Sequence, residues 1–354
     1  MRTERMENAT MTVERRSSGK IRFSGAVGRL AAGAALLAGL GLCMNAAAAQ
    51  TAAKSSAAPG QRSAARRSAG PQAGQQTFAS ADEASKALVA ALQSEDQQQM
   101  LKVLGASAKD IVSSGDETAD KEERQQIVQK YQEMHRLVTE PDGTTTLYIG
   151  AENWPTPIPL MHKGNQWYFD SAAGKQEILY RRVGRNELAV IQVCSELVDA
   201  EKEYYGQPHD GGPANQYAEK FWSDPGKHNG LYWKSAPGET DSPIGPMLAA
   251  AVADGSAGDS GQAPEPFDGY YFRMLKAPAG AHTQSVSQSS AGSGAASGGF
   301  AFVAYPAKYR SSGVMTFLVD QKGIVYEKDL GPRTEELAKA MTQYRRDATW
   351  RKAD

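Results

Sequence analysis

The chain has few cysteines and almost no net charge. Its 354 residues include two cysteines, Cys43 and Cys194, and their formal net charge is −1. This charge balance provides no basic surface for phosphates, so we expect no nucleic-acid partner. Cys43 lies in a segment that we expect to be removed, so the mature chain cannot form an internal disulfide. Cys194 is at helical spacing from Leu197 and is predicted to be a buried, small hydrophobic residue.

Catalytic and cofactor-binding motifs are also missing from the sequence. There is no G-x-S-x-G elbow and no dinucleotide-binding fingerprint, and the five histidines form no H-x-x-x-H pair. The nearest approach to a metal pair is Asp224 with His228, in a turn-rich segment that supplies no third ligand. We therefore predict no cofactor, no metal and no assigned catalytic residue.

The amino-terminal segment has the pattern of a signal peptide. Basic residues between Arg15 and Arg29 precede an uncharged apolar run over 30–42, which ends in the small residues Ala46–Ala49. The apolar run is shorter than the ~20 residues that a membrane-spanning helix needs. The sequence thus predicts a cleaved signal peptide at 1–49, export to the periplasm or the medium, and no membrane span afterwards. An uncleaved signal anchor is the alternative.

A linker and a first module follow the signal segment. Residues 50–76 are rich in Ala, Ser, Gln and Gly, which is typical of a disordered linker. Residues 77–173 contain three amphipathic helical patterns and then β-type runs that end on the aromatic strand 166–169. We predict a small N-terminal α+β module here.

The remaining residues, 174–354, predict a second module. A long amphipathic helix over 174–206 is followed by a meander of antiparallel strands and a last helix, with the Gly/Ser-rich segments 254–266 and 277–299 as surface loops. We expect the sheet to pack against the long helix, which makes the whole chain α+β. Local patterns also predict a helical turn at 217–222, a strand at 230–233, and Leu337, Met341 and Tyr344 on one face of the last helix.

Several strings occur in the order found in one bacterial family. They include Trp154-Pro155, Trp167-Tyr-Phe-Asp170, Gly184-Arg-Asn-Glu-Leu188, Gly230-Leu-Tyr-Trp233, Gly269-Tyr-Tyr-Phe-Arg273 and Ser312-Gly-Val-Met-Thr-Phe317. On these strings the chain resembles the family known as domain of unknown function 2950 over nearly all of 78–351. The resemblance implies a secreted or envelope location and no known activity. The C-terminal half is also loosely similar to the globular domains of type IV pilins and type II secretion pseudopilins, which implies a pilin-like fold.

Two groups of side chains are candidate binding residues. Arg181, Arg182 and Arg185 form the densest charge cluster, and they either bind an anion, join the modules, or make ordinary helical ion pairs. The aromatic residues Trp222, Tyr232 and Trp233 either line a sugar- or peptide-binding groove or fill the core.

Three functions are compatible with these patterns. The export signal, the linker and the missing catalytic motifs favour a non-enzymatic envelope protein that binds or scaffolds another envelope protein. The first alternative is a cell-wall or carbohydrate-binding module that uses surface Trp and Tyr. The second is a hydrolase with an unrecognised site, for which Asp224, His228 and Glu239 would be the residues to test. Oligomeric state is left open.

Overall fold

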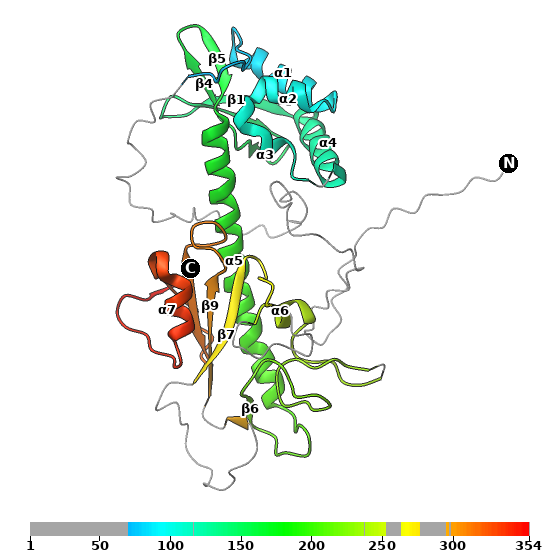
Figure 1. Cartoon of the computed structure of the whole chain (residues 1–354), viewed down its shortest axis with the longest axis vertical. Coiled ribbons are helices and arrows are strands. Elements are labelled where there is room, and N and C mark those ends of the chain that lie inside the picture. Colours follow the sequence, from blue (N-terminus) through cyan, green and yellow to red (C-terminus); the bar gives the residue numbers. More distant parts are fainter. Residues whose placement is uncertain are drawn as a thin grey trace, which may run out of the picture.

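The computed structural model describes residues 70–115, 117–236, 238–252, 263–276, 295–296 and 299–353 (Figure 1). The predicted signal peptide, most of the predicted linker and most of the two Gly/Ser-rich segments lie outside these ranges. The described chain combines helices with antiparallel sheets, which confirms the α+β class. No helix of the described residues is long and apolar enough to cross a membrane. Export and the domain boundaries stay predictions.

The N-terminal half packs four helices on a small antiparallel sheet. The helices are α1 (Ala81–Gln93), α2 (Gln97–Leu104), α3 (Lys109–Val112) and α4 (Glu117–Glu133), with a 3-10 turn, η1 (Ala106–Ala108), before α3. The strands are β1 (His135–Thr139), β2 (Thr145–Ile149), β3 (Trp154–Pro155), β4 (Leu160–Lys163) and β5 (Gln166–Phe169). They run in the order β1-β2-β4-β5, with β3 paired to β2. Side-chain caps begin the first two helices, because Ser80 accepts from Glu83 N and Asp96 accepts from Gln98 N.

Residues 70–76, which the sequence assigned to the linker, are part of this half. Gln75 is buried, and its Nε2 donates to Phe169 O at 2.9 Å. Gln72 donates through its own side-chain amide to Ser107 Oγ at 2.7 Å. Composition alone favoured a linker because Gln and Gly are also typical of flexible chain. The contacts depend on carbonyl and hydroxyl groups supplied by distant segments.

The long helix α5 (Ser171–Tyr205) runs through both halves of the molecule (Figure 1). Asp170 caps its first turn by accepting from Ala173 N at 3.0 Å. At its start, Gly174 lies so close to Ile158 that a Cβ there would be 2.6 Å from Ile158 Cγ1, which explains why glycine occupies this position. Further along, a stripe that includes Val190, Cys194 and Leu197 is fully buried. The predicted burial of Cys194 is confirmed.

The C-terminal half is built around a five-stranded antiparallel sheet of order β12-β11-β10-β9-β7. Its strands are β7 (Tyr270–Lys276), β9 (Phe300–Pro306), β10 (Met315–Asp320), β11 (Tyr326–Asp329) and β12 (Arg351–Lys352). The smaller elements are β6 (Tyr217–Ala218), which pairs with β8 (Ala295–Ala296), then α6 (Pro246–Ala250), the 3-10 turn η2 (Gly331–Arg333) and α7 (Thr334–Ala340). A tight turn joins β10 to β11 and is closed by Gly323 N donating to Asp320 O at 2.8 Å.

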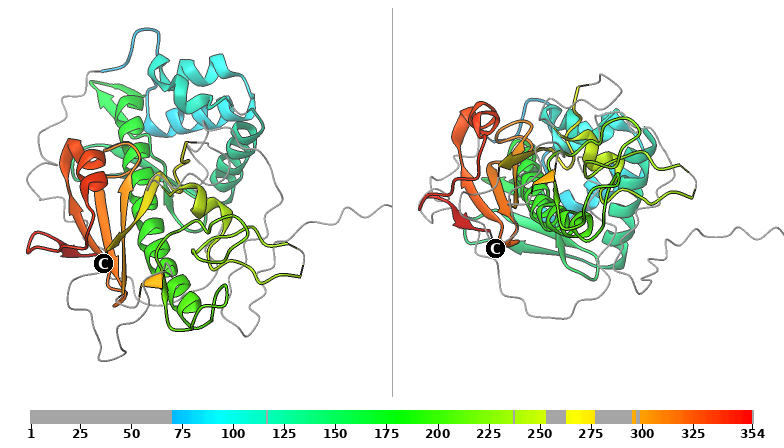
Figure 2. Two further views of the ribbon diagram at one scale, coloured as in Figure 1. Left: turned by 60° about the horizontal axis from the view of Figure 1, so that its bottom comes forward. Right: turned by 90° about the horizontal axis from the view of Figure 1, so that it is seen from below.

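Both faces of this sheet are covered. Every residue of β9 is buried; Phe302 belongs to the core shared with α5, and Val303 packs with Trp350 on the opposite face. Alternate residues of a strand point to opposite faces, so one strand contributes to two cores. Figure 2 shows α7 on the side of the sheet away from α5.

The helical turn predicted at 217–222 is wrong, because contacts with residues 231–232 compete with helix formation. Residues 217–222 are extended rather than helical, since Tyr232 N donates to Phe221 O and Ser223 N donates to Tyr232 O. The strand predicted at 230–233 is reduced to a single bridge in the same ladder.

The last helix is also shorter than predicted. It ends at Ala340, where the guanidinium of Arg273 donates to the carbonyl oxygens of Ala338, Lys339 and Met341. Beyond the helix the chain is extended, and Tyr344 N donates to Lys276 O at 3.0 Å. Met341 and Tyr344 still pack on the outer core, although not from a helix.

Candidate functional site

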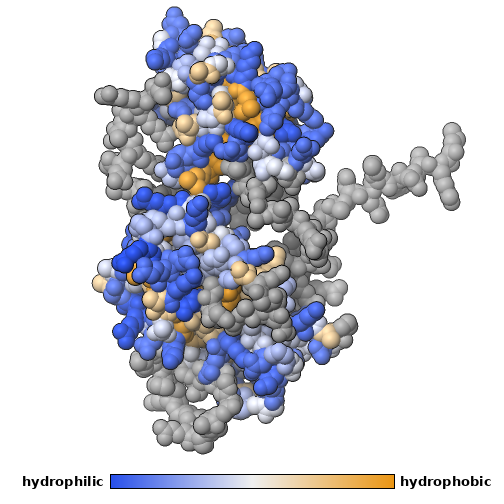
Figure 3. Space-filling model, in the orientation of Figure 1, coloured by the Kyte–Doolittle hydropathy of each residue, from blue (hydrophilic) through white to orange (hydrophobic). Residues whose placement is uncertain are grey.

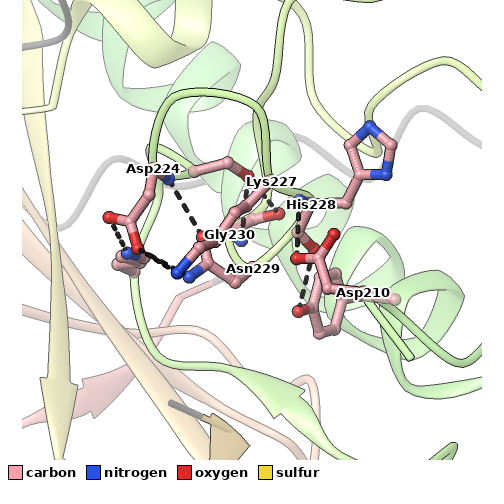
Figure 4. A network of polar contacts seen from close by, with 9 residues as sticks. Asp210, Asp224, Lys227, His228, Asn229 and Gly230 are labelled. Carbon is pink, nitrogen blue, oxygen red and sulfur yellow. Dashed lines mark hydrogen bonds and ion pairs between the residues drawn. The ribbon is translucent and has the colours of Figure 1, made fainter. Parts of the chain in front are cut away.

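The segment with Asp224 and His228 is a loop held by its own side chains (Figure 4). Asp224 accepts from Asn229 Nδ2 at 2.8 Å and from the ammonium group of Lys220. These two hydrogen bonds, with Lys220 the stronger influence, lower the pKa of Asp224 below its ordinary value. Its carboxylate is therefore engaged in fixing the turn.

His228 does not face Asp224. Figure 4 shows its ring pointing away from that carboxylate, and the ring lies 4.5 Å from the ring of Trp233, centroid to centroid. The backbone N–H of His228 donates to Asp210 Oδ2 at 2.8 Å. Within the part of the chain that the structure describes, no group of three or more His, Cys, Asp or Glu residues could hold a metal ion.

Glu239, the third residue of the hydrolase alternative, also stabilises a turn. Its Oε2 accepts from Ala236 N at 2.9 Å. Among the described residues, no hydrogen bond or ion pair joins Glu239 to Asp224 or His228. No two of these three side chains are therefore placed to act together as a general acid and a general base.

The aromatic candidates are largely taken up by the core. Trp233 is 8% exposed, and its Nε1 donates to Thr240 O at 2.9 Å. Trp222 is half-buried, donates to Ala249 O at 3.0 Å and packs edge-to-face against Tyr232. Trp233 thus belongs to the core, so the prediction that it lines a binding groove on the surface is wrong for this residue.

Two of the three candidate arginines hold α5 to neighbouring segments. Arg181 Nη1 donates to Pro155 O at 2.7 Å, its Nε pairs with Glu177 at 2.9 Å, and its guanidinium stacks over the Trp154 ring. Arg182 Nη2 donates to Ser311 O at 3.1 Å. These contacts join the N-terminal sheet, α5 and the loop before β10.

The residues next to this cluster attach α5 to the C-terminal sheet. Asn186 Nδ2 donates to Ser312 O at 2.8 Å. Glu187 Oε1 accepts from the backbone N–H groups of Val314 and Met315 at 2.8 and 3.0 Å. Gly313 lies between Ser312 and Val314 in the chain, and a Cβ there would overlap the buried ring of Tyr270. The Asn-Glu-Leu and Gly-Val-Met-Thr-Phe strings therefore contact each other and hold α5 against the sheet.

A pocket of about 80 Å³ lies in the N-terminal half, walled by the four helices and the chain that follows β3. Its apolar lining includes Leu92 of α1, Met100 and Leu104 of α2, Ile111 of α3 and Ile158. All five pack in or against one hydrophobic core. The pocket therefore extends into that core and is not a shallow surface depression.

The polar lining of this pocket comes from α4 and from Thr156. Three of its atoms, Glu123 Oε1, Arg124 Nε and Thr156 Oγ1, are shielded from solvent and have no hydrogen-bond partner among the described residues. Leaving a buried polar group without a partner costs about 1–3 kcal/mol. Asp120, by contrast, accepts from Ser114 N and Ser114 Oγ at 3.0 and 2.6 Å.

The carboxyl of Glu123 titrates near neutrality. Burial raises its pKa to about 7, and the nearby charge of Asp120 acts in the same direction. The charges of Arg185 and Arg124 oppose this rise. Arg185, the third candidate arginine, is exposed on α5. It acts on Glu123 through its charge, which lowers the pKa of that carboxyl.

Sequence reasoning did not find this pocket, although α4 carried a signal. Asp120, Arg124, Ile127 and Tyr131 are spaced by four, three and four residues, so they share one face of the helix. Two charged residues on the face that carries Ile127 and Tyr131 are therefore expected to lie near the apolar core. The partners from α1, α2 and Thr156 come from distant segments and could not be assigned from spacing.

These features define an α+β protein whose two halves share one long helix and whose N-terminal half carries an amphipathic pocket. The chain matches the family model described as protein of unknown function (DUF2950) over residues 75–353, and it belongs to that family. No curated protein and no solved structure matches the chain. The likeness of the C-terminal half to pilin domains therefore stays a prediction.

Proposed function

We propose that this protein is an exported, non-enzymatic component of the cell envelope that binds another protein through the middle of α5. The observation that carries the proposal is an exposed apolar surface on that helix. Tyr180 is 59% exposed and Leu188 is 65% exposed, and Gly184 lies between them with open space where a Cβ would be. Residues at spacings of four lie on one helix face, so these three form a single strip.

The position of the strip supports a role in binding. It lies where α5 passes from one half to the other, since neighbouring Arg181 donates to Pro155 O and Arg182 donates to Ser311 O. Figure 3 shows hydrophobic residues on the surface between the two halves. Exposed Arg185 borders it, which favours a partner with an apolar patch and carboxylates at its edge. Large exposed apolar side chains cost solvation free energy that a partner protein would recover.

Two other parts of this proposal, export and a non-enzymatic role, are supported by separate observations. The signal-peptide pattern at 1–49 supports export. Asp224, His228 and Glu239 are each engaged in structural contacts, so the side chains named for hydrolysis stabilise loops instead.

Site-specific photo-cross-linking in cells tests the α5 surface. A photoreactive amino acid at Leu188 or Tyr180 should capture a discrete envelope protein, identified by mass spectrometry. The matched control is Glu336, which is exposed on α7 and therefore lies off the α5 helix. Equal capture from all three positions, or no capture from Leu188 and Tyr180, would refute the proposed surface. Signal cleavage is tested separately by sequencing the amino terminus of the exported protein.

A further inference from the structure

The size of the N-terminal pocket limits what it could hold. Its volume is about 80 Å³, roughly half of the ~150 Å³ that accommodates a benzene ring in an engineered cavity. The inner walls, which include Met100 and Leu104, are apolar and form part of the core. A short, branched aliphatic group of a few carbons matches this space, and a fatty-acid chain does not.

The polar end of the pocket indicates the head group. Arg124 Nε and Thr156 Oγ1 are hydrogen-bond donors without a partner among the described residues. A guanidinium group forms its strongest hydrogen bonds with carboxylates. When Glu123 is protonated, its carboxyl supplies a third donor, whereas Asp120 is already bonded to Ser114.

We propose that this pocket binds a short aliphatic carboxylate, with the alkyl group against Met100 and Leu104 and the carboxylate against Arg124 and Thr156. A free short-chain acid and the C-terminal Leu or Val of a peptide share this chemistry. The site goes beyond the proposed protein-binding surface on α5 and does not depend on it, because the residues that would contact the ligand differ from those of the strip. Arg185 borders the strip and acts on the pocket only through its charge.

The charges around Glu123 predict how binding depends on pH. Asp120 and Arg124 of α4 and Arg185 of α5 act on Glu123, whose pKa is about 7. An ionised Glu123 repels a bound carboxylate, whereas a protonated Glu123 donates a hydrogen bond to it. Raising the pH from about 6 to about 8 should therefore weaken binding about tenfold, since most of the protonated form is lost.

Isothermal titration of the purified intact chain tests the ligand class. Isovalerate, N-acetyl-glycyl-leucine and their neutral amides are the probes. We expect saturable binding of at least one of the two carboxylates and binding about tenfold weaker for its amide. Binding of isovalerate assigns the site to a free acid, and binding of the peptide alone assigns it to a protein C-terminus. No saturable binding of either at millimolar concentration, or equal binding of acid and amide, overturns the proposal.

Variants place the ligand in this pocket. Arg124→Gln and Thr156→Val should weaken binding, and Glu123→Gln should retain binding but remove its pH dependence. Ile111→Phe should fill the space and abolish binding while far-ultraviolet circular dichroism remains that of the parent. Glu122→Gln, on the exposed side of α4, is the matched control and should change nothing. Unchanged binding in folded Ile111→Phe and Thr156→Val variants would show that the ligand lies elsewhere.

Discussion

Glu201 is a buried carboxyl whose replacement should make the protein more stable at alkaline pH. It lies on α5 with 0% exposure, and its Oε2 accepts from Ala218 N at 3.0 Å. Oε1 has no hydrogen-bond partner among the described residues. Burial raises the pKa of Glu201 from 4.5 to about 8, although the bond from Ala218 opposes the rise.

The sign of the effect follows from proton binding. Between pH 4.5 and about 8 the folded protein retains the proton on Glu201, whereas the unfolded chain releases it. The unfolded state binds fewer protons, so the free energy of unfolding falls as the pH rises through this window. Each pKa unit corresponds to about 1.4 kcal/mol, so the loss approaches roughly 5 kcal/mol at most. Glu201→Gln cannot ionise, and its amide oxygen can still accept from Ala218 N.

Urea unfolding of the parent and of Glu201→Gln measures this effect. We expect the two to differ by less than about 1 kcal/mol near pH 5 and the variant to be about 3–5 kcal/mol more stable near pH 8.5. Other titrating groups are common to both proteins and cancel in the difference. Glu196→Gln, at an exposed position on the same helix, should show no such trend. A difference between Glu201→Gln and the parent that stays constant with pH would refute the reasoning.

Two further matched pairs on α5 test the packing. Gly174→Ala should lower the free energy of unfolding by about 1–3 kcal/mol, because the new Cβ would lie 2.6 Å from Ile158 Cγ1. Gly184→Ala, which meets open space, should raise it by about 0.5–1 kcal/mol through helix propensity; the same sign in both variants would contradict this account. Leu197→Ala should cost about 3–5 kcal/mol because Leu197 is fully buried, whereas Leu188→Ala at 65% exposure should stay within about 0.5 kcal/mol. Both pairs are measured by chemical denaturation, and equal costs for the two leucines would be inconsistent with the packing described.

The candidate site was less predictable than the fold. Asp224 and His228, four residues apart, are the nearest approach to a metal pair in the sequence, but the His228 ring lies against Trp233 instead. Trp233 was a surface candidate because aromatic side chains serve both interfaces and cores. Its 8% exposure depends on His228, Thr240 and the core around it, which sequence spacing does not specify.

The N-terminal pocket shows the same limit. The spacing on α4 placed Arg124 and Ile127 on one face, but the pocket exists only because Met100 and Ile158 face that helix. The raised pKa of Glu123 has the same origin, since desolvation depends on segments that are distant in the sequence.

The sequence by itself determined the features that depend on neighbouring residues. Apolar spacing over 174–206 predicted α5, and β-type runs in succession predicted the antiparallel meander. Only the tertiary structure decided that residues 217–222 are extended, that Arg273 ends α7, and that Glu123 faces a pocket with no partner for its Oε1 among the described residues. Local periodicity arises from backbone geometry within one element, whereas burial and hydrogen-bond partners arise where elements far apart in the chain meet.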